Sequence, residues 1–358
     1  MWPLLLVCLV PPGGDGRDIR ADDPWSAVDG TLDTLAPARS DGPSWGVLVR
    51  TFYTHAPVEA GAGTNDVSGF VFEDIDLYLA ARYDDLAWRF SADAAEGTAN
   101  LEDAWASWHA LDWLTLTAGQ FKPRVARSGS VPEDALLFRE RTFLGAAFDE
   151  HDDGAELGGH YDQFDYWLAV TDGSNGEGSD HFWSARGEWA LYDAAWDDLE
   201  GAYGAPNHLR VLIGATKFED VSISTAHGGG WSSDLALTFG PYSFAAEYAD
   251  LERSFARTID VFDGHLITLG DGQPRSFTLS RRVGEGGEAA VRFETADDAD
   301  STEALVLGAN WRPLGSLARF VADVAMVDGD TRDFSIFSLG VQIGSSGITR
   351  PFIGDGAP

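Results

Sequence analysis

The stretch FVFEDIDLYLAARYDDLAWRFSAD, residues 70–93, contains two runs of alternating polarity joined by a polar link. In the first run, apolar residues such as Ile75, Leu77 and Leu79 alternate with Asp76 and Tyr78. Successive side chains of a β-strand point to opposite faces, so each run places its apolar residues on one face. The stretch therefore predicts two antiparallel strands and a tight turn. Glu73 is the one charged residue that the pattern places on the apolar face of the first strand.

Segments of the same kind continue along almost the whole chain, separated by Gly, Asp, Asn or Pro. Seventeen segments fit the pattern. If they form a bacterial outer-membrane β-barrel, as argued below, their number should be even. We therefore expect 16 strands, with 18 as the alternative. The segments are 44–54, 70–82, 86–93, 101–110, 113–121, 154–161, 164–171, 181–192, 208–217, 231–240, 242–251, 261–269, 276–282, 288–295, 305–312, 318–327 and 334–343.

Alternating polarity alone does not separate a soluble sandwich from a membrane barrel, because the two folds invert the same pattern. The number of strands favours the barrel, since a sandwich rarely needs so many. The aromatic content of 12%, with 13 Trp, suits a barrel with aromatic residues at the lipid boundary. No stretch approaches the roughly 20 apolar residues of a spanning helix. The predicted fold is an all-β transmembrane antiparallel barrel.

The ends of the chain differ from this repeating region. Residues 1–10 resemble the apolar core of a signal peptide, so we expect a leader over 1–23. We expect a periplasmic segment over 24–43, the barrel over 44–343 and a C-terminal tail over 344–358. The single cysteine, Cys8, lies in the leader, which excludes disulfides and cysteine metal sites from the mature chain.

The formal charge of −34 argues against nucleic acid as a partner, because a phosphate backbone requires a basic surface. Lys122 and Lys217 are the only lysines, and the other 22 cationic residues are arginines. A fixed row of arginines in a pore would be a usable anion site, since guanidinium stays charged and has a rigid donor geometry. A general compositional preference for Arg explains the same count.

One connection, residues 122–153, is much longer than the others. A structureless connection of this length is often functional, and in a barrel it can fold into the lumen and narrow it. We therefore predict an inward-folded constriction loop, with a short helix around 132–138. Its cations are the candidate constriction and anion-binding residues, and the alternative is that they are solvated charges paired with acids such as Glu133 and Asp134. They are Lys122, Arg124, Arg127, Arg139 and Arg141.

Several arginines fall inside strand candidates. A charge that faces lipid at mid-depth costs roughly 2–4 kcal/mol, so in a barrel these side chains should face the lumen. In a soluble sheet they would lie on an ordinary solvated face. The predicted lumen-facing residues are Arg50, Arg82, Arg89, Arg186 and Arg292.

The sequence also bears on catalysis and metal binding. The sequence has no nucleophile elbow, no HExxH zinc helix and no phosphate-binding Gly loop. The Gly- and Asp-rich stretch 172–180 has oxygen ligands but not the spacing of a calcium loop. We expect neither enzyme activity nor a cofactor or metal.

A family resemblance rests on the order of several short motifs. AGQFKP at 118–123 ends a strand before the long connection, and FSAD at 90–93 followed by LEDAW at 101–105 fits the hairpin upstream. The motifs downstream are LAVTDG at 168–173, GPYSF at 240–244, EAAVRF at 288–293 and LGANWRP at 307–313. In this order they resemble the phosphate-selective porins O and P of Gram-negative bacteria.

The resemblance implies a homotrimer in the outer membrane that passes small anionic solutes such as phosphate or polyphosphate. The chain departs from the family in three places: the last strand is followed by residues 344–358, the long loop has no lysine cluster, and residues 263–273 fit poorly. The alternative function is a secreted or periplasmic β-rich protein for carbohydrate binding or adhesion. An uninterrupted lipid-facing band of apolar residues would distinguish the barrel from that module.

Overall fold

The structure is a computed structural model of the chain. It describes residues 43–56, 67–95, 97–173, 181–192, 200–221, 228–252, 255–261, 265–313, 317–330 and 332–345. The predicted leader and periplasmic segment lie outside these residues except for residue 43, as does the predicted tail beyond residue 345.

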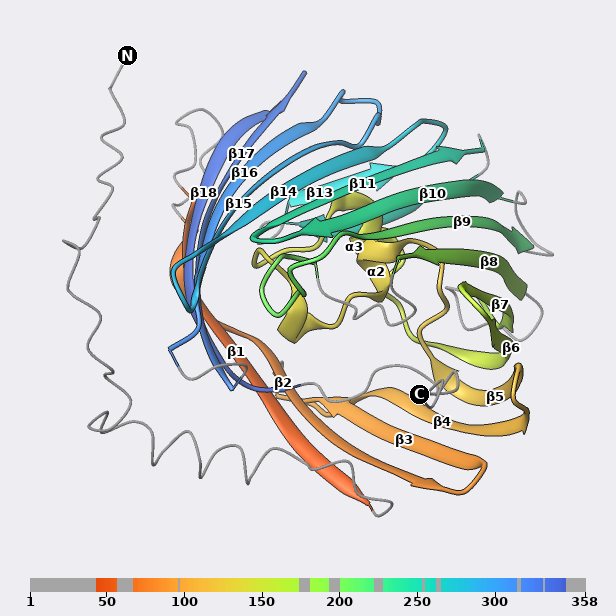
Figure 1. The fold of residues 1–358 in the computed structure, drawn as a ribbon. Coiled ribbons are helices and arrows are strands. Elements are labelled where there is room, and N and C mark those ends of the chain that lie inside the picture. The colour runs from red at the N-terminus through yellow and green to blue at the C-terminus, as the bar shows by residue number, and fades with distance from the viewer. Residues whose placement is uncertain are drawn as a thin grey trace, which may run out of the picture. The chain divides into compact units, whose positions relative to one another are not determined.

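Sixteen strands form a closed antiparallel barrel, each paired with its neighbours along the chain (Figure 1). Strand β11 pairs with β14, and β1 closes the ring by pairing with both β2 and β18. This confirms the prediction of 16 strands in the barrel. The strands are β1(Ser44–Ala56), β2(Val67–Tyr83), β3(Leu86–Asp93), β4(Asn100–Leu111), β5(Leu114–Phe121), β6(Asp152–Tyr161), β7(Phe164–Thr171), β8(His181–Leu191), β9(Arg210–Val221), β10(Gly228–Phe239), β11(Tyr242–Leu251), β14(Arg275–Val283), β15(Gly287–Thr295), β16(Glu303–Trp311), β17(Ala318–Gly329) and β18(Arg332–Gly344).

The polarity of the barrel wall is inverted relative to a soluble β-sandwich. On β14, Ser276, Thr278 and Ser280 point inward and are buried, while Phe277 and Leu279 point outward and are 45% and 49% exposed. The same alternation recurs around the ring. It fits a barrel whose outer surface faces lipid, since a soluble sheet would bury its apolar face.

Exposed aromatic residues gather at the end of the barrel where the short turns lie. A band of aromatics at the boundary between lipid and water is typical of membrane barrels. In this barrel the exposed aromatics lie at the β2–β3, β4–β5, β6–β7 and β10–β11 turns and at the adjoining ends of β8 and β16. They include Tyr83, Trp113, Tyr161, Trp189, Phe239, Tyr242 and Trp311.

Among the described residues, register shifts occur in three strand pairs, β1–β2, β3–β4 and β4–β5, and the first two affect charged residues that face the lumen. Between β1 and β2, Arg50 pairs with Asp74 and Thr51 with Phe72, which leaves Glu73 as the extra residue of a β-bulge. Between β3 and β4, the register shifts between Phe90 and Ala92. The first bulge explains the anomaly in the sequence, because Glu73 turns away from the apolar face and forms an ion pair with Arg139 in the long loop at 2.8 Å.

The prediction of a single strand over residues 261–269 is wrong. β12(Arg257–Val261) and β13(His265–Leu269) pair with each other in a separate two-stranded sheet and are not part of the barrel. Their buried residues Ile259, Val261, Ile267 and Leu269 belong to an apolar cluster. A hairpin with one buried face has the same period-2 pattern as a barrel strand, so the sequence pattern does not distinguish them.

The long connection between β5 and β6 lies inside the ring of strands (Figure 1). It contains α2(Arg127–Ser130), the 3-10 turn η2(Glu133–Ala135) and α3(Phe143–Ala147). The helix expected around 132–138 is therefore only the 3-10 turn, and both α-helical turns lie outside that range. None of the helices in the described residues is long and apolar enough to cross a membrane.

Candidate functional site: the loop-filled lumen

Carboxylates of the barrel strands, together with Glu200 from the connection between β8 and β9, hold the backbone of the long loop. Each accepts a hydrogen bond from a loop N–H group, which leaves the acid buried and paired. Three of these acids, Glu247 on β11, Glu294 on β15 and Asp323 on β17, lie on strands far from the loop in sequence. The bonds are Ser128 N to Glu247 (2.7 Å), Leu137 N to Glu200 (2.6 Å), Arg139 N to Asp323 (2.7 Å) and Phe143 N to Glu294 (2.7 Å).

Donors on the wall bind the carbonyl groups of the same loop. These contacts come from β1, β10, β15 and β16, so the loop is attached to widely separated parts of the ring. They are Arg50 to the Arg139 carbonyl (2.7 Å), Ser232 to Val125 (2.8 Å), Arg292 to Glu140 (2.9 Å) and Asn310 to Leu137 (2.7 Å). Wall and loop thus satisfy each other's buried polar groups.

Four of the five arginines predicted to face the lumen are buried beside carboxylates. Arg82 instead lies near the turn after β2 and donates to the Asp84 carbonyl at 3.3 Å. The four ion pairs join Arg50 to Asp74 (2.6 Å), Arg89 to Asp103 (2.6 Å), Arg186 to Asp234 (2.7 Å) and Arg292 to Glu294 (2.9 Å). Because each of these guanidinium groups already pairs with a carboxylate, its contacts stabilise the fold and leave less positive charge for a solute.

The loop cations Lys122 and Arg141 belong to one partly buried ionic cluster with Glu133 and Asp149. Arg141 pairs with Asp149 at 2.6 Å and also with Glu133, and Lys122 contacts Asp149 and lies 3.6 Å from Glu133. Burial raises the pKa of Glu133, but Lys122 and Arg141 outweigh it and hold this pKa well below its usual range. Burial lowers the pKa of Lys122, yet Asp149 and Glu133 raise it overall.

Of the other loop cations, Arg139 pairs with Glu73 on β2, and Arg127 is buried on α2. Arg124 differs from both. It is only 4% exposed, its guanidinium lies 4.3 Å from the centre of the Trp167 ring, and its Nη1 has no hydrogen-bond partner among the described residues. Burial lowers the pKa of Arg124, and the nearby Glu156 acts in the opposite direction.

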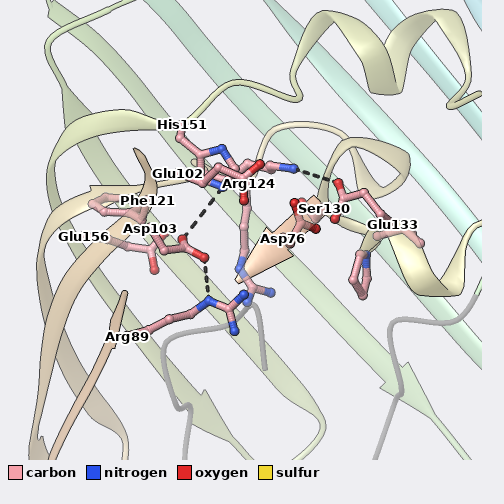
Figure 2. A pocket seen from close by; sticks show the side chains of 13 residues that line it. Asp76, Arg89, Glu102, Asp103, Phe121, Arg124, Ser130, Glu133, His151 and Glu156 are labelled. Carbon is pink, nitrogen blue, oxygen red and sulfur yellow. Dashed lines mark hydrogen bonds and ion pairs between the residues drawn. The ribbon is translucent and has the colours of Figure 1, made fainter. Parts of the chain in front are cut away.

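A cavity of about 40 Å³ lies between the start of the loop and strands β2 to β6 (Figure 2). Arg124, Lys122 and Arg89 line it, but carboxylates outnumber these cations. The acidic residues around it are Asp76, Glu102, Asp103, Glu133 and Glu156. Sequence analysis did not single out these five residues as a site, although the inward position of Asp76 on its strand was a usable signal.

Asp76 and His151 are two further titratable residues that line the cavity. Asp76 is 4% exposed, and its Oδ1 has no hydrogen-bond partner among the described residues. Burial, assisted by Lys122, lowers the pKa of His151 to about 4, so this imidazole is neutral at pH 7. The His151 Nε2 lies 3.8 Å from Asp103.

Within the described ranges, no three His, Cys, Asp or Glu side chains are arranged to hold a metal ion.

The opposite side of the lumen is apolar. Loop residues such as Phe138, Phe143 and Phe148 pack against the β12–β13 hairpin and against inward residues of β8, β9 and β16 to β18. Ring contacts join Phe148 to Phe218 (4.9 Å) and to Phe255 (5.7 Å). This cluster fills that side, so the polar cavity beside β2 to β6 is the narrow polar space identified in the described lumen.

The closed barrel with a loop inside it is similar to several solved structures of outer-membrane proteins. OprB of Pseudomonas putida has a TM-score of 0.62 at 8% identity, over 89% of this chain and 97% of that chain. OmpF of Salmonella typhi, in a complex with daunomycin, has a TM-score of 0.60 at 10% identity, over 85% and 98%. A porin mutant of Rh. blastica has a TM-score of 0.53 at 10% identity, over 84% and 99%. The chain therefore has the fold of outer-membrane porins.

Sequence comparisons are less informative. No protein-family model matches the chain, and no curated protein matches it. The resemblance to phosphate-selective porins O and P therefore stays a prediction.

Proposed function

We propose that the chain is an outer-membrane channel of Gram-negative type through which small hydrophilic solutes diffuse. The observation that carries the proposal is the inverted polarity of the closed barrel, with exposed apolar side chains outside and buried polar ones inside. A wall of this kind is stable in lipid and leaves a polar interior for water and solutes. The likeness to porin structures supports the same function.

The narrow part of the passage, in this proposal, is the cavity between the loop and strands β2 to β6. The apolar cluster around Phe143 and Phe148 fills the opposite side, and hydrophilic solutes avoid such a surface. A cavity of about 40 Å³ admits water and small ions but restricts larger solutes. The loop would therefore act as a size filter.

A finer version of the proposal takes anions such as phosphate or polyphosphate as the solutes and a homotrimer as the assembly. The resemblance in sequence implies both, and an anion is also favoured by the Arg124 Nη1, which has no hydrogen-bond partner in the described part of the chain. Against it, carboxylates already pair with Lys122, Arg139 and Arg141. That pairing removes much of the positive charge that an anion site needs.

Liposome swelling tests the channel function. We expect vesicles that contain the folded protein to swell in an isosmotic solution of a very small solute such as urea, and to swell far more slowly in sugars, which exceed a passage of about 40 Å³. Vesicles without protein are the control. Protein that stays soluble, binds sugar and causes no swelling would favour the carbohydrate-binding alternative, and chemical cross-linking in detergent tests the trimer.

A further inference from the structure

Asp76 on β2 and Glu102 on β4 face the same cavity, and neither forms an ion pair with a basic side chain among the described residues. The Asp76 Oδ1 is buried and accepts no hydrogen bond from the described residues, and Glu102 only accepts from the Ser91 hydroxyl at 3.4 Å. The charged groups that act most strongly on Asp76 are Glu102, Asp74, Glu133 and Asp93, which are all carboxylates. Isolated buried carboxylates are costly, so a cation that enters the cavity would be stabilised there.

Local strand geometry produces this arrangement. The register shift between Phe90 and Ala92 sets Ser91 against both Glu102 and Asp103, and both acids then line the cavity. The Arg89 Nε forms an ion pair with the Asp103 Oδ2 at 2.6 Å, whereas Glu102 forms no ion pair among the described residues. Figure 2 shows the Arg89–Asp103 bond and, apart from it, the carboxyl groups of Asp76 and Glu102.

The cations around the cavity compensate these two acids only in part, because Lys122 attracts Glu102 but is shared with other carboxylates. Lys122 is bound to Asp149 and Glu133, and the guanidinium of Arg124 lies over Trp167. His151 adds no positive charge at pH 7 because burial holds its pKa at about 4. The lining therefore contains five carboxylates against Arg89, Lys122 and Arg124.

We infer that Asp76 and Glu102 form a binding site for small monovalent cations in the passage, and that the channel passes these cations in preference to anions. Charged side chains at a constriction select ions by field and contact, and low-dielectric walls strengthen the field. The space of about 40 Å³ suits one small ion or an ammonium group with little of its hydration shell. The inference rests on the proposed channel function.

Reversal potential in a planar bilayer under a KCl gradient tests the inference. We expect cation preference in the wild-type protein, and a cation-to-anion permeability ratio about fivefold lower in Asp76→Asn or Glu102→Gln, the effect of a unit charge at ~4 Å in water-like surroundings. Asp328→Asn and Glu303→Gln are matched controls, because both acids are exposed strand residues outside the cavity. The control variants should keep the wild-type ratio.

The possible outcomes distinguish failure of the cation site from failure of the channel function. Channels that prefer anions, or a ratio unchanged in the Asp76→Asn and Glu102→Gln double variant, would overturn the cation site and leave the channel standing. Anion preference that Arg124→Gln abolishes would instead support the phosphate version. Absence of conductance from folded wild-type protein would overturn the channel itself and the inference with it. The wild-type measurement decides the sign of the selectivity even if a variant fails to fold.

Discussion

Glu73 shows how a single extra residue determines the use of a charged side chain. Regular alternation places Glu73 on the lipid-facing side of β2, where a carboxylate is unfavourable. The bulge opposite Arg50 moves it inward, beside Arg139. Glu73 and Asp74 consequently both serve as partners of arginines that hold the loop.

Gly119 provides a test of backbone geometry at the end of β5. Its φ of +123° is outside the region that other residues favour, and a Cβ there would lie 2.1 Å from the Ala104 carbonyl oxygen. We expect Gly119→Ala to destabilise the barrel by about 1–3 kcal/mol or more. Urea unfolding followed by gel mobility measures this. Gly69→Ala is the control, because a Cβ at Gly69 meets no atom within 4 Å. Equal stability of the two variants would contradict the positive φ and the close backbone contact described at Gly119.

His151 predicts a pH dependence. Its folded pKa of about 4 lies below the ordinary value near 6.5, so as the pH falls the unfolded chain binds the proton first. The stability contributed by the neutral imidazole is present above pH ~6.5 and is lost between pH ~6.5 and ~4. Thermal unfolding across this range should show a shallower decline for His151→Gln than for wild type. Substitution of the exposed His181 should leave the slope unchanged, and equal slopes in all three proteins would refute the role of His151.

At the scale of elements, the sequence predicted the barrel strands far better than the contents of the lumen. Period-2 alternation is a local signal, and it identified the sixteen wall strands with small errors at their ends. It also merged the β12–β13 hairpin into one barrel strand, because burial against the loop and exposure to lipid give the same pattern. Only the pairing of the strands distinguishes the β12–β13 hairpin from a strand of the barrel wall.

The attachments of the loop could not be predicted from local sequence. Ser128 binds Glu247 and Leu137 binds Glu200, and such pairs depend on the closure of the ring. The loop cations could be named from their position, but whether each was paired or free could not. Glu102 was missed for a related reason, since its position at the cavity depends on an irregular register that alternation does not indicate.

The β12–β13 hairpin offers a test at this scale. Ile267 is buried in the apolar cluster, whereas the neighbouring Leu266 is exposed on the other face of β13. Ile267→Ser should cost about 2–5 kcal/mol of local packing and release the hairpin without unfolding the barrel. Limited proteolysis should then cut near the hairpin, with normal heat resistance of the barrel, and Leu266→Ser should remain protected. Equal protection of both variants would contradict the packing described.

Across the whole molecule, buried charge is nearly balanced despite the net charge of −34. Among the described residues, ten buried arginines accompany eleven buried carboxylates. Most of the acidic excess therefore lies outside the buried interior. In the lumen, most buried arginines and carboxylates pair with each other. Asp76, Glu102 and Arg124 are the exceptions on which selectivity depends in this account.

The central claim is that solutes pass the cavity between the loop and strands β2 to β6. Single-channel conductance tests it most directly, in wild type and in Ser130→Trp, which adds bulk to the cavity lining. Ser335→Trp, on the exposed outward side of β18, is the matched control. The account predicts discrete channels in wild type and the control, and strongly reduced conductance in Ser130→Trp. Equal conductance in all three folded proteins would contradict the proposed passage.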